Sequence, residues 1–228
     1  MLYKFFQKIE PTLKRLYKKL SEPPIPNLKG DRDIEYSWIA ANMPDGPGEA
    51  LDFGSGPSYM GLIAVRKGFK VTAIDLEKQT FFFEHPDFKF VQGDLFKLNL
   101  PKDHFDLIIN CSAIEHVGLA ERYSVVESRP DGDIEAMSIL RSILKPGGIM
   151  LMTIPVGVDK VFMPFHRVYG KKRIPLLLNS WEVVKEEFWI KDSRNLYICV
   201  EREKALNTEP LEYCYGLGLF VLRKPEKE

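Results

Sequence analysis

The feature of this sequence that most restricts its fold is a series of short apolar segments that alternate with helical segments. The apolar segments have few polar positions, so both of their faces are expected to be buried. Strands of this kind belong to a parallel sheet that is covered by helices on both sides. The expected strands are 49–53, 70–75, 88–91, 105–110 and 149–154, with helices over 58–67, 77–84 and 133–144. The sequence therefore predicts a doubly wound, mostly parallel α/β fold.

Further elements are expected on either side of this core. Residues 1–20 carry apolar residues three and four positions apart together with several lysines, which predicts a basic amphipathic helix that Pro11 kinks. A proline-rich connector and a short helix over 32–42 follow it. The last third of the chain is expected to hold a helix over 171–179 and strands over 183–189 and 218–222. We expect an N-terminal helical extension and linker over 1–44 and one domain over 45–228.

Composition excludes several classes of protein. The 228 residues carry 32 basic and 32 acidic side chains, so the chain is formally neutral and nucleic-acid binding is not favoured. No apolar run approaches the roughly 18–20 residues that a transmembrane helix needs. Cys111, Cys199 and Cys214 lie far apart and form no C-x-x-C pair. Free thiols and a reducing compartment, the cytoplasm, are therefore expected.

A glycine-rich turn follows the first expected strand, in the run Leu51-Asp52-Phe53-Gly54-Ser55-Gly56-Pro57-Ser58. The glycines allow the backbone to approach a ligand closely, but such a turn is shared by many nucleotide sites. Tyr59 stands where the dinucleotide fingerprint needs glycine or alanine, which argues against a nicotinamide oxidoreductase. Asp52 would repel a pyrophosphate, whereas its carboxylate suits a ligand that carries an ammonium group.

Polar residues also follow the next three strands. Asp75 ends the second strand and suits ribose hydroxyls, and Asp94-Leu95 follows the third strand, where a carboxylate can accept from an adenine amine. Asn110 and Cys111 end the fourth strand. Because parallel strands bring their carboxyl ends to one edge, these residues predict one ligand site there.

Taken together, the run 51–58, Asp75, Asp94, the strand 105–110 and Lys145-Pro146-Gly147-Gly148 resemble the class I, Rossmann-like S-adenosylmethionine-dependent methyltransferases over about residues 45–155. The resemblance implies a seven-stranded sheet and S-adenosyl-L-methionine as cofactor. It also implies the cofactor-binding residues, namely Asp52, Gly54, Gly56, Asp75, Asp94, Leu95, Asn110 and Cys111. Gly54 and Gly56 would pass under the methionine part, with Asp52 near its amino group. Ser58 departs from the pattern, because many members have a third glycine there.

Catalytic candidates follow the fourth strand. Many small-molecule members of the family carry a Glu-His or similar pair at this point, which here is Glu115-His116. His116 could act as a general base on an acceptor hydroxyl or amine, since histidine titrates near neutral pH. The alternative is that Glu115 and His116 only shape the cofactor pocket.

A second polar cluster follows the fifth strand. His166 is the other candidate base, and Arg167 and Tyr169 are expected to contact the substrate. Asp131-Gly132-Asp133 looks like part of a metal loop, but aspartate is favoured at the start of a helix, so we expect a helix cap and no metal.

The expected reaction is direct displacement at a sulfonium methyl group. Residues 110–113 lack the Asn/Asp-Pro-Pro-Tyr/Phe motif that is typical of methyltransferases acting on amino groups of DNA or on protein glutamine. A small-molecule or carbohydrate acceptor, methylated on oxygen or nitrogen, is therefore preferred. The alternatives are an RNA or protein methyltransferase guided by the basic residues 1–20, and a non-catalytic cofactor-binding partner subunit. Peripheral surface contact by residues 1–20 and the oligomeric state stay open.

Overall fold

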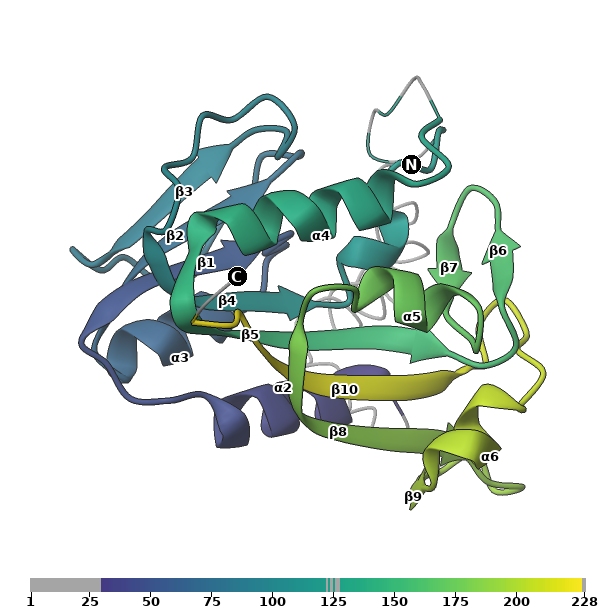
Figure 1. Cartoon of the computed structure of the whole chain (residues 1–228). Helices are drawn as coiled ribbons and strands as arrows, with labels where there is room; N and C mark the ends of the chain where they lie inside the picture. Colours follow the sequence, from purple (N-terminus) through teal and green to yellow (C-terminus); the bar gives the residue numbers. More distant parts are fainter. Residues whose placement is uncertain (1–29, 122, 124, 126–127, 227–228) are drawn as a thin grey trace, which may run out of the picture. The chain divides into compact units, whose positions relative to one another are not determined.

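The computed structural model of the chain describes residues 30–121, 123, 125 and 128–226 (Figure 1). The chain divides into two compact units, Met1–Gly30 and Asp31–Glu228, and the second holds nearly all described residues. The expected amphipathic helix over 1–20 lies outside the described residues. The expected boundary at 44/45 falls inside the second unit, because the helix over 31–42 packs on the sheet.

One mixed sheet forms the centre of this unit. Its strands, in spatial order, are β3 (Phe88–Gln92), β2 (Phe69–Asp75), β1 (Gly48–Phe53), β4 (Phe105–Cys111), β5 (Leu144–Val156), β10 (Gly216–Arg223), β8 (Glu182–Lys191) and β9 (Tyr197–Val200). The first five in this order pair in parallel, and β10, β8 and β9 pair antiparallel. The structure therefore confirms the expected Rossmann-like α/β fold, with β9 as a strand beyond the seven that were expected.

Helices cover both faces of the sheet (Figure 1). One face packs against α2 (Asp31–Asn42) and α3 (Met60–Arg66), and the other against α4 (Gly132–Ile143), α5 (Arg173–Leu177) and α6 (Arg202–Leu206). Successive strand residues alternate between the two cores. Ile109 packs with Trp38 and Ile39 of α2, and Ile108 packs with Leu140 of α4. This alternation explains why the strands are apolar at nearly every position.

The strand order reverses beside β1. The chain leaves β1 toward the α2/α3 face, and it leaves β4 through the 3-10 helix η1 (Ile114–His116) toward the α4 face. Two connections that diverge in this way open a crevice at the carboxyl ends of the strands, which is where ligands bind in doubly wound folds.

Several elements differ from the expectation. Residues 77–84 form no helix; Phe81 and Phe83 instead pack against Phe88, with ring centroids 4.9 and 4.8 Å away. A separate hairpin of β6 (Lys160–Phe162) and β7 (His166–Val168) follows β5 and was not expected. Among the described residues, no helix combines the length and the apolar character that crossing a membrane requires.

Candidate functional site

A cavity of about 540 Å³ opens at the carboxyl ends of β1, β2, β3 and β4. Its walls come from the glycine turn after β1, the residues that follow β2 and β3, η1, the loop after η1, and α2. Small-molecule and cofactor sites fall in this size range. The cavity therefore coincides with the edge that the sequence analysis selected.

The two glycines of the turn have different surroundings. Both have positive φ, 63° at Gly54 and 52° at Gly56, which favours glycine over any L-residue. A Cβ at Gly54 would lie 2.4 Å from the Cβ of Ala113, so this glycine lets the turn pack against η1. A Cβ at Gly56 would meet no atom within 4 Å. Gly56 therefore presents bare backbone to the cavity, as a bound ligand in close contact requires.

Asp52 is the most unusual group at the cavity. Its side chain lies at the end of β1, the residue is 2% exposed, and Oδ2 accepts no hydrogen bond from any described residue. Burial raises the pKa of Asp52 to about 7; the nearby amide of Gly61 lowers it by less, and the charge of Asp75 raises it further. A buried carboxylate without a partner is costly, so this oxygen points to a cationic ligand.

Asp75 and Asp94 lie on the same rim. Asp75 accepts hydrogen bonds from the amides of Gly56 and Glu77, each at 2.9 Å, and so ties the glycine turn to β2. Asp94 accepts from the amide of Phe96 at 3.0 Å. Both carboxylates line the cavity together with Leu95, and their oxygens retain lone pairs for a ligand.

The two residues at the end of β4 fall in different places. Cys111 lines the cavity, and burial, followed by the negative charge of Glu35, raises the pKa of its thiol well above the usual range. Asn110 is fully buried and does not line the cavity; its Oδ1 accepts from the amide of Ile114 at 3.2 Å. The expected cofactor contact of Asn110 is therefore corrected to a role in holding η1.

α2 contributes residues that the sequence analysis missed. Arg32 and Tyr36, one helical turn apart, both line the cavity. Between them, Glu35 is fully buried and accepts hydrogen bonds from the hydroxyls of Ser112 and Thr153 as well as from Arg32. The spacing of Arg32 and Tyr36 on one helix face was a usable signal, but this helix was assigned to the extension.

His116 lines the cavity, as a candidate base requires. Its Nδ1 is 2.6 Å from the carbonyl oxygen of Phe165. A carbonyl only accepts, so Nδ1 carries the proton and the lone pair of the neutral ring lies on Nε2. Glu115 is buried behind it, with Oε1 3.7 Å from Nε2, and burial is the main cause that raises its pKa to about 8.

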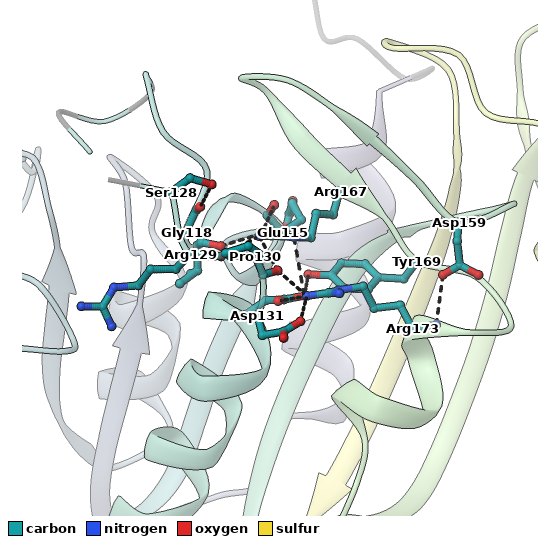
Figure 2. A network of polar contacts seen from close by, with 12 residues as sticks. Glu115, Gly118, Ser128, Arg129, Pro130, Asp131, Asp159, Arg167, Tyr169 and Arg173 are labelled. Atoms are coloured by element: carbon teal, nitrogen blue, oxygen red, sulfur yellow. Dashed lines mark hydrogen bonds and ion pairs between the residues drawn. The ribbon is translucent and has the colours of Figure 1, made fainter. Parts of the chain in front are cut away.

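Arg167 and Tyr169 do not contact the cavity, which corrects the expected substrate contacts. Arg167 is 2% exposed and Tyr169 is fully buried. Arg167 donates to the carbonyl oxygens of Val117 at 2.5 Å and Pro130 at 3.2 Å (Figure 2). It therefore fixes the loop that follows η1 instead of meeting a substrate.

Asp133 is the carboxylate to which Arg173 and Tyr169 donate. It is fully buried, and Arg173 donates to both of its oxygens, at 2.9 and 2.5 Å. The hydroxyl of Tyr169 donates to Oδ2 at 3.1 Å, and the Nε of Arg167 lies 3.9 Å from the same oxygen. The side chain of Arg129 points away from this network and lies 4.6 Å over the ring of Phe96, at the cavity.

Two other candidates change their role. His166 does not line the cavity; its ring packs 5.0 Å from that of Tyr215 and 5.5 Å from that of Phe162. Asp131 lies at the start of α4, and its Oδ1 forms an ion pair with Nη2 of Arg173 at 3.2 Å. In the described part of the chain, no three His, Cys, Asp or Glu side chains are grouped as a metal site would need.

A protein-family model described as "Caenorhabditis protein of unknown function, DUF268" matches residues 92–213, which is more than half of the chain. The chain belongs to the DUF268 family. The matched residues of this DUF268 protein include Glu115, His116, Arg167 and Asp133, but not β1 and its glycine turn.

Three comparisons relate this DUF268 chain to other proteins. YqeM of Bacillus subtilis (strain 168), which carries a methyltransferase name, is 26% identical over 123 residues, 51% of this chain and 46% of YqeM. This chain therefore spans about half the length of that relative.

The other two are solved structures. The 1,6-didemethyltoxoflavin-N1-methyltransferase of Burkholderia thailandensis, with bound S-adenosylhomocysteine, is 16% identical with a TM-score of 0.51, covering 98% of this chain and 87% of that chain. The [4+2]-cyclase SpnF is 15% identical with a TM-score of 0.58, covering 83% and 80%. The chain thus has the class I methyltransferase fold.

The two glycines give a first prediction. Gly56→Ala should cost about 1–2 kcal/mol of unfolding free energy from its positive φ, and its methyl group should lower the affinity for S-adenosylhomocysteine at least about tenfold. Gly54→Ala should be more destabilising, because it also meets Ala113. Urea denaturation and titration calorimetry measure the two effects. Normal binding by Gly56→Ala would remove the turn from the site.

Asp52 gives a second prediction, on pH. The folded pKa of about 7 lies above the reference of 3.8, so the protein without ligand should lose stability as pH rises from 4 through 7. Asp52→Asn should remove this loss and become the more stable protein at pH 8, by an amount on the order of 2–4 kcal/mol. Denaturant titrations at pH 5 and pH 8 measure it.

The matched control is Asp133→Asn, a second buried aspartate, whose arginines would lose their partner. It should be destabilising at both pH values. An Asp52→Asn protein whose stability relative to the parent is the same at pH 5 and pH 8 would contradict the second prediction.

Proposed function

We propose that the chain is an S-adenosylmethionine-dependent methyltransferase that acts on an oxygen or nitrogen of a small-molecule or sugar-type acceptor. The observation that carries this proposal is the cavity edge itself. The unpartnered carboxylate of Asp52, the bare backbone of Gly56 and the carboxylates of Asp75 and Asp94 follow three adjacent strands. Asp52 fits an ammonium group, and Gly56 allows the chain that carries this group to lie close to the backbone. Asp75 fits a ribose and Asp94 an adenine amine.

The fold alone does not carry the activity, since SpnF shares it and is a [4+2]-cyclase. Support for methyl transfer comes from the cavity residues whose chemistry fits S-adenosyl-L-methionine, namely Asp52, Gly56, Asp75 and Asp94. When bound, S-adenosyl-L-methionine would supply a methyl group on a sulfonium; the acceptor oxygen or nitrogen would bond to that methyl carbon as its bond to sulfur breaks, with S-adenosylhomocysteine as the leaving group. Positioning is then the largest contribution that the protein makes, on the order of 7–11 kcal/mol.

His116 is proposed to receive the acceptor's proton. Its Nδ1–H donates to the carbonyl of Phe165, so Nε2 holds the lone pair in the neutral ring. Once protonated, Nε2 would lie 3.7 Å from Oε1 of Glu115, and a positive charge there favours the ionised form of that carboxyl. A general base of this kind adds about 10²- to 10⁴-fold in rate, so the enzyme should keep some activity without it.

The acceptor class rests on the remaining walls. Tyr36, Tyr123 and Val125 line the same cavity as His116, which suits a small ring-shaped or partly apolar acceptor. RNA or protein as acceptor is the runner-up. The cofactor and the acceptor would share one cavity of about 540 Å³, which favours a small molecule over a polymer. We keep the cytoplasm as the proposed compartment because Cys111, Cys199 and Cys214 are free thiols.

Labelling tests the proposal directly. The protein is incubated with methyl-labelled S-adenosyl-L-methionine and an extract separated into small molecules, RNA and protein. Label in the small-molecule fraction is the expected result, and label in RNA or protein would support the runner-up. Tight binding of S-adenosylhomocysteine without label in any fraction would instead indicate a non-catalytic partner subunit or a different reaction.

Replacing the two histidines gives the third prediction. With the labelled acceptor, His116→Ala should lower kcat about 10²- to 10⁴-fold while the affinity for S-adenosylhomocysteine stays within about threefold. His166→Ala is the control and should leave kcat nearly unchanged, since His166 packs beside Tyr215 outside the cavity. Equal kcat in the His116→Ala and parent proteins would assign His116 to shaping the pocket.

A further inference from the structure

Asp52 and Cys111 point to the same face of the sheet. Asp52 pairs with Ile109 across the parallel β1–β4 ladder, so these two side chains share a face, and Cys111 lies two residues beyond Ile109. Ile109 belongs to the core beneath α2 and α3. The unpartnered carboxylate of Asp52 therefore lies on the side of the sheet that α2 covers.

Arg32 reaches the same place from α2. Its Nη1 lies 3.7 Å from Sγ of Cys111, and both residues line the cavity. No ion pair joins Arg32 to Asp52 within the described residues, although their charges are opposite. A carboxylate and a guanidinium that line one cavity without pairing with each other suit a ligand with both charges.

The guanidinium of Arg32 is held through Nη1. Nη1 donates to Glu35 at 2.7 Å, and the buried Glu35 is fixed in turn by the hydroxyls of Ser112 and Thr153. Nε and Nη2 have no hydrogen-bond partner among the described residues, and the side chain is 48% exposed. An arginine that keeps adjacent N–H groups available is suited to a bidentate carboxylate.

We propose that Arg32 binds the carboxylate of the cofactor's amino-acid end, whose ammonium group is already expected at Asp52. This inference rests on the proposed function. Glu35 acts as a positioning residue for Arg32, and α2 closes the methionine side of the cavity. The N-terminal helix of the unit is thus part of the cofactor site.

The test compares two ligands that differ by one group. S-adenosylhomocysteine carries both charges, and its decarboxylated counterpart, S-adenosyl-3-thiopropylamine, keeps only the ammonium. Arg32→Ala should lower the affinity for S-adenosylhomocysteine about 10- to 100-fold and leave that for the decarboxylated ligand within about threefold. Arg32→Lys should give an intermediate loss, because lysine keeps the charge without the fork.

Controls separate binding from folding. Arg32→Gln combined with Glu35→Gln removes both charges of the buried pair and should show the same ligand-dependent loss. Arg129→Ala changes a second arginine among the described residues that line the cavity, and it should spare both affinities. Asp52→Asn should weaken both ligands, since both carry the ammonium.

Three results would overturn the assignment: equal losses for the two ligands in Arg32→Ala, no loss for either, or a carboxylate-dependent loss at Arg129 instead. If neither ligand is weakened but acceptor binding is, Arg32 would hold an acidic acceptor. A parent protein that binds neither ligand would refute the proposed function itself, which is a distinguishable outcome.

Discussion

The divergence of the chain after β1 and after β4 is the constraint on which the site depends. One connection turns to the α3 face and the other, through η1, to the α4 face, so neither covers the strand ends between them. The crevice is lined at the strand ends by the backbone of Gly56 and by carboxylates, and α2 and the loop after η1 form its outer walls. The binding edge is therefore a consequence of topology, and the side chains only select what binds there.

Two buried aspartates differ in whether the fold itself provides partners for their charge. Asp133 is surrounded by Arg173, Tyr169 and Arg167, so its charge is balanced within the fold. Asp52 is equally buried but has an oxygen without a partner. The first carboxylate stabilises the loops around η1, whereas the second is costly until a cation arrives, which is the expected signature of a ligand-binding group.

Sequence reasoning recovered the sheet and its carboxyl edge because both depend on local patterns, namely apolar strands and acids or glycines at their ends. Five residues that were selected from the sequence line one cavity, namely Asp52, Gly56, Asp75, Asp94 and His116. Sequence reasoning failed for Arg167 and Tyr169, because a polar residue after a strand looks the same whether it faces a ligand or a buried aspartate. Nothing local distinguishes the two cases; the partner, Asp133, lies more than thirty residues away in the chain.

The expectation of a helix over 77–84 was wrong because aromatic packing on Phe88 outweighs weak helix propensity.

The packing of α2 on the sheet bears on how the protein can be divided experimentally. Trp38 and Ile39 cover Leu217 and Leu219 of β10, a strand at the opposite end of the sequence. A recombinant fragment that starts at β1 would expose this apolar surface to water and leave Ser112, with its left-handed backbone, without the carboxylate that accepts from it. Shortened versions for crystallisation or screening should therefore begin no later than Asp31.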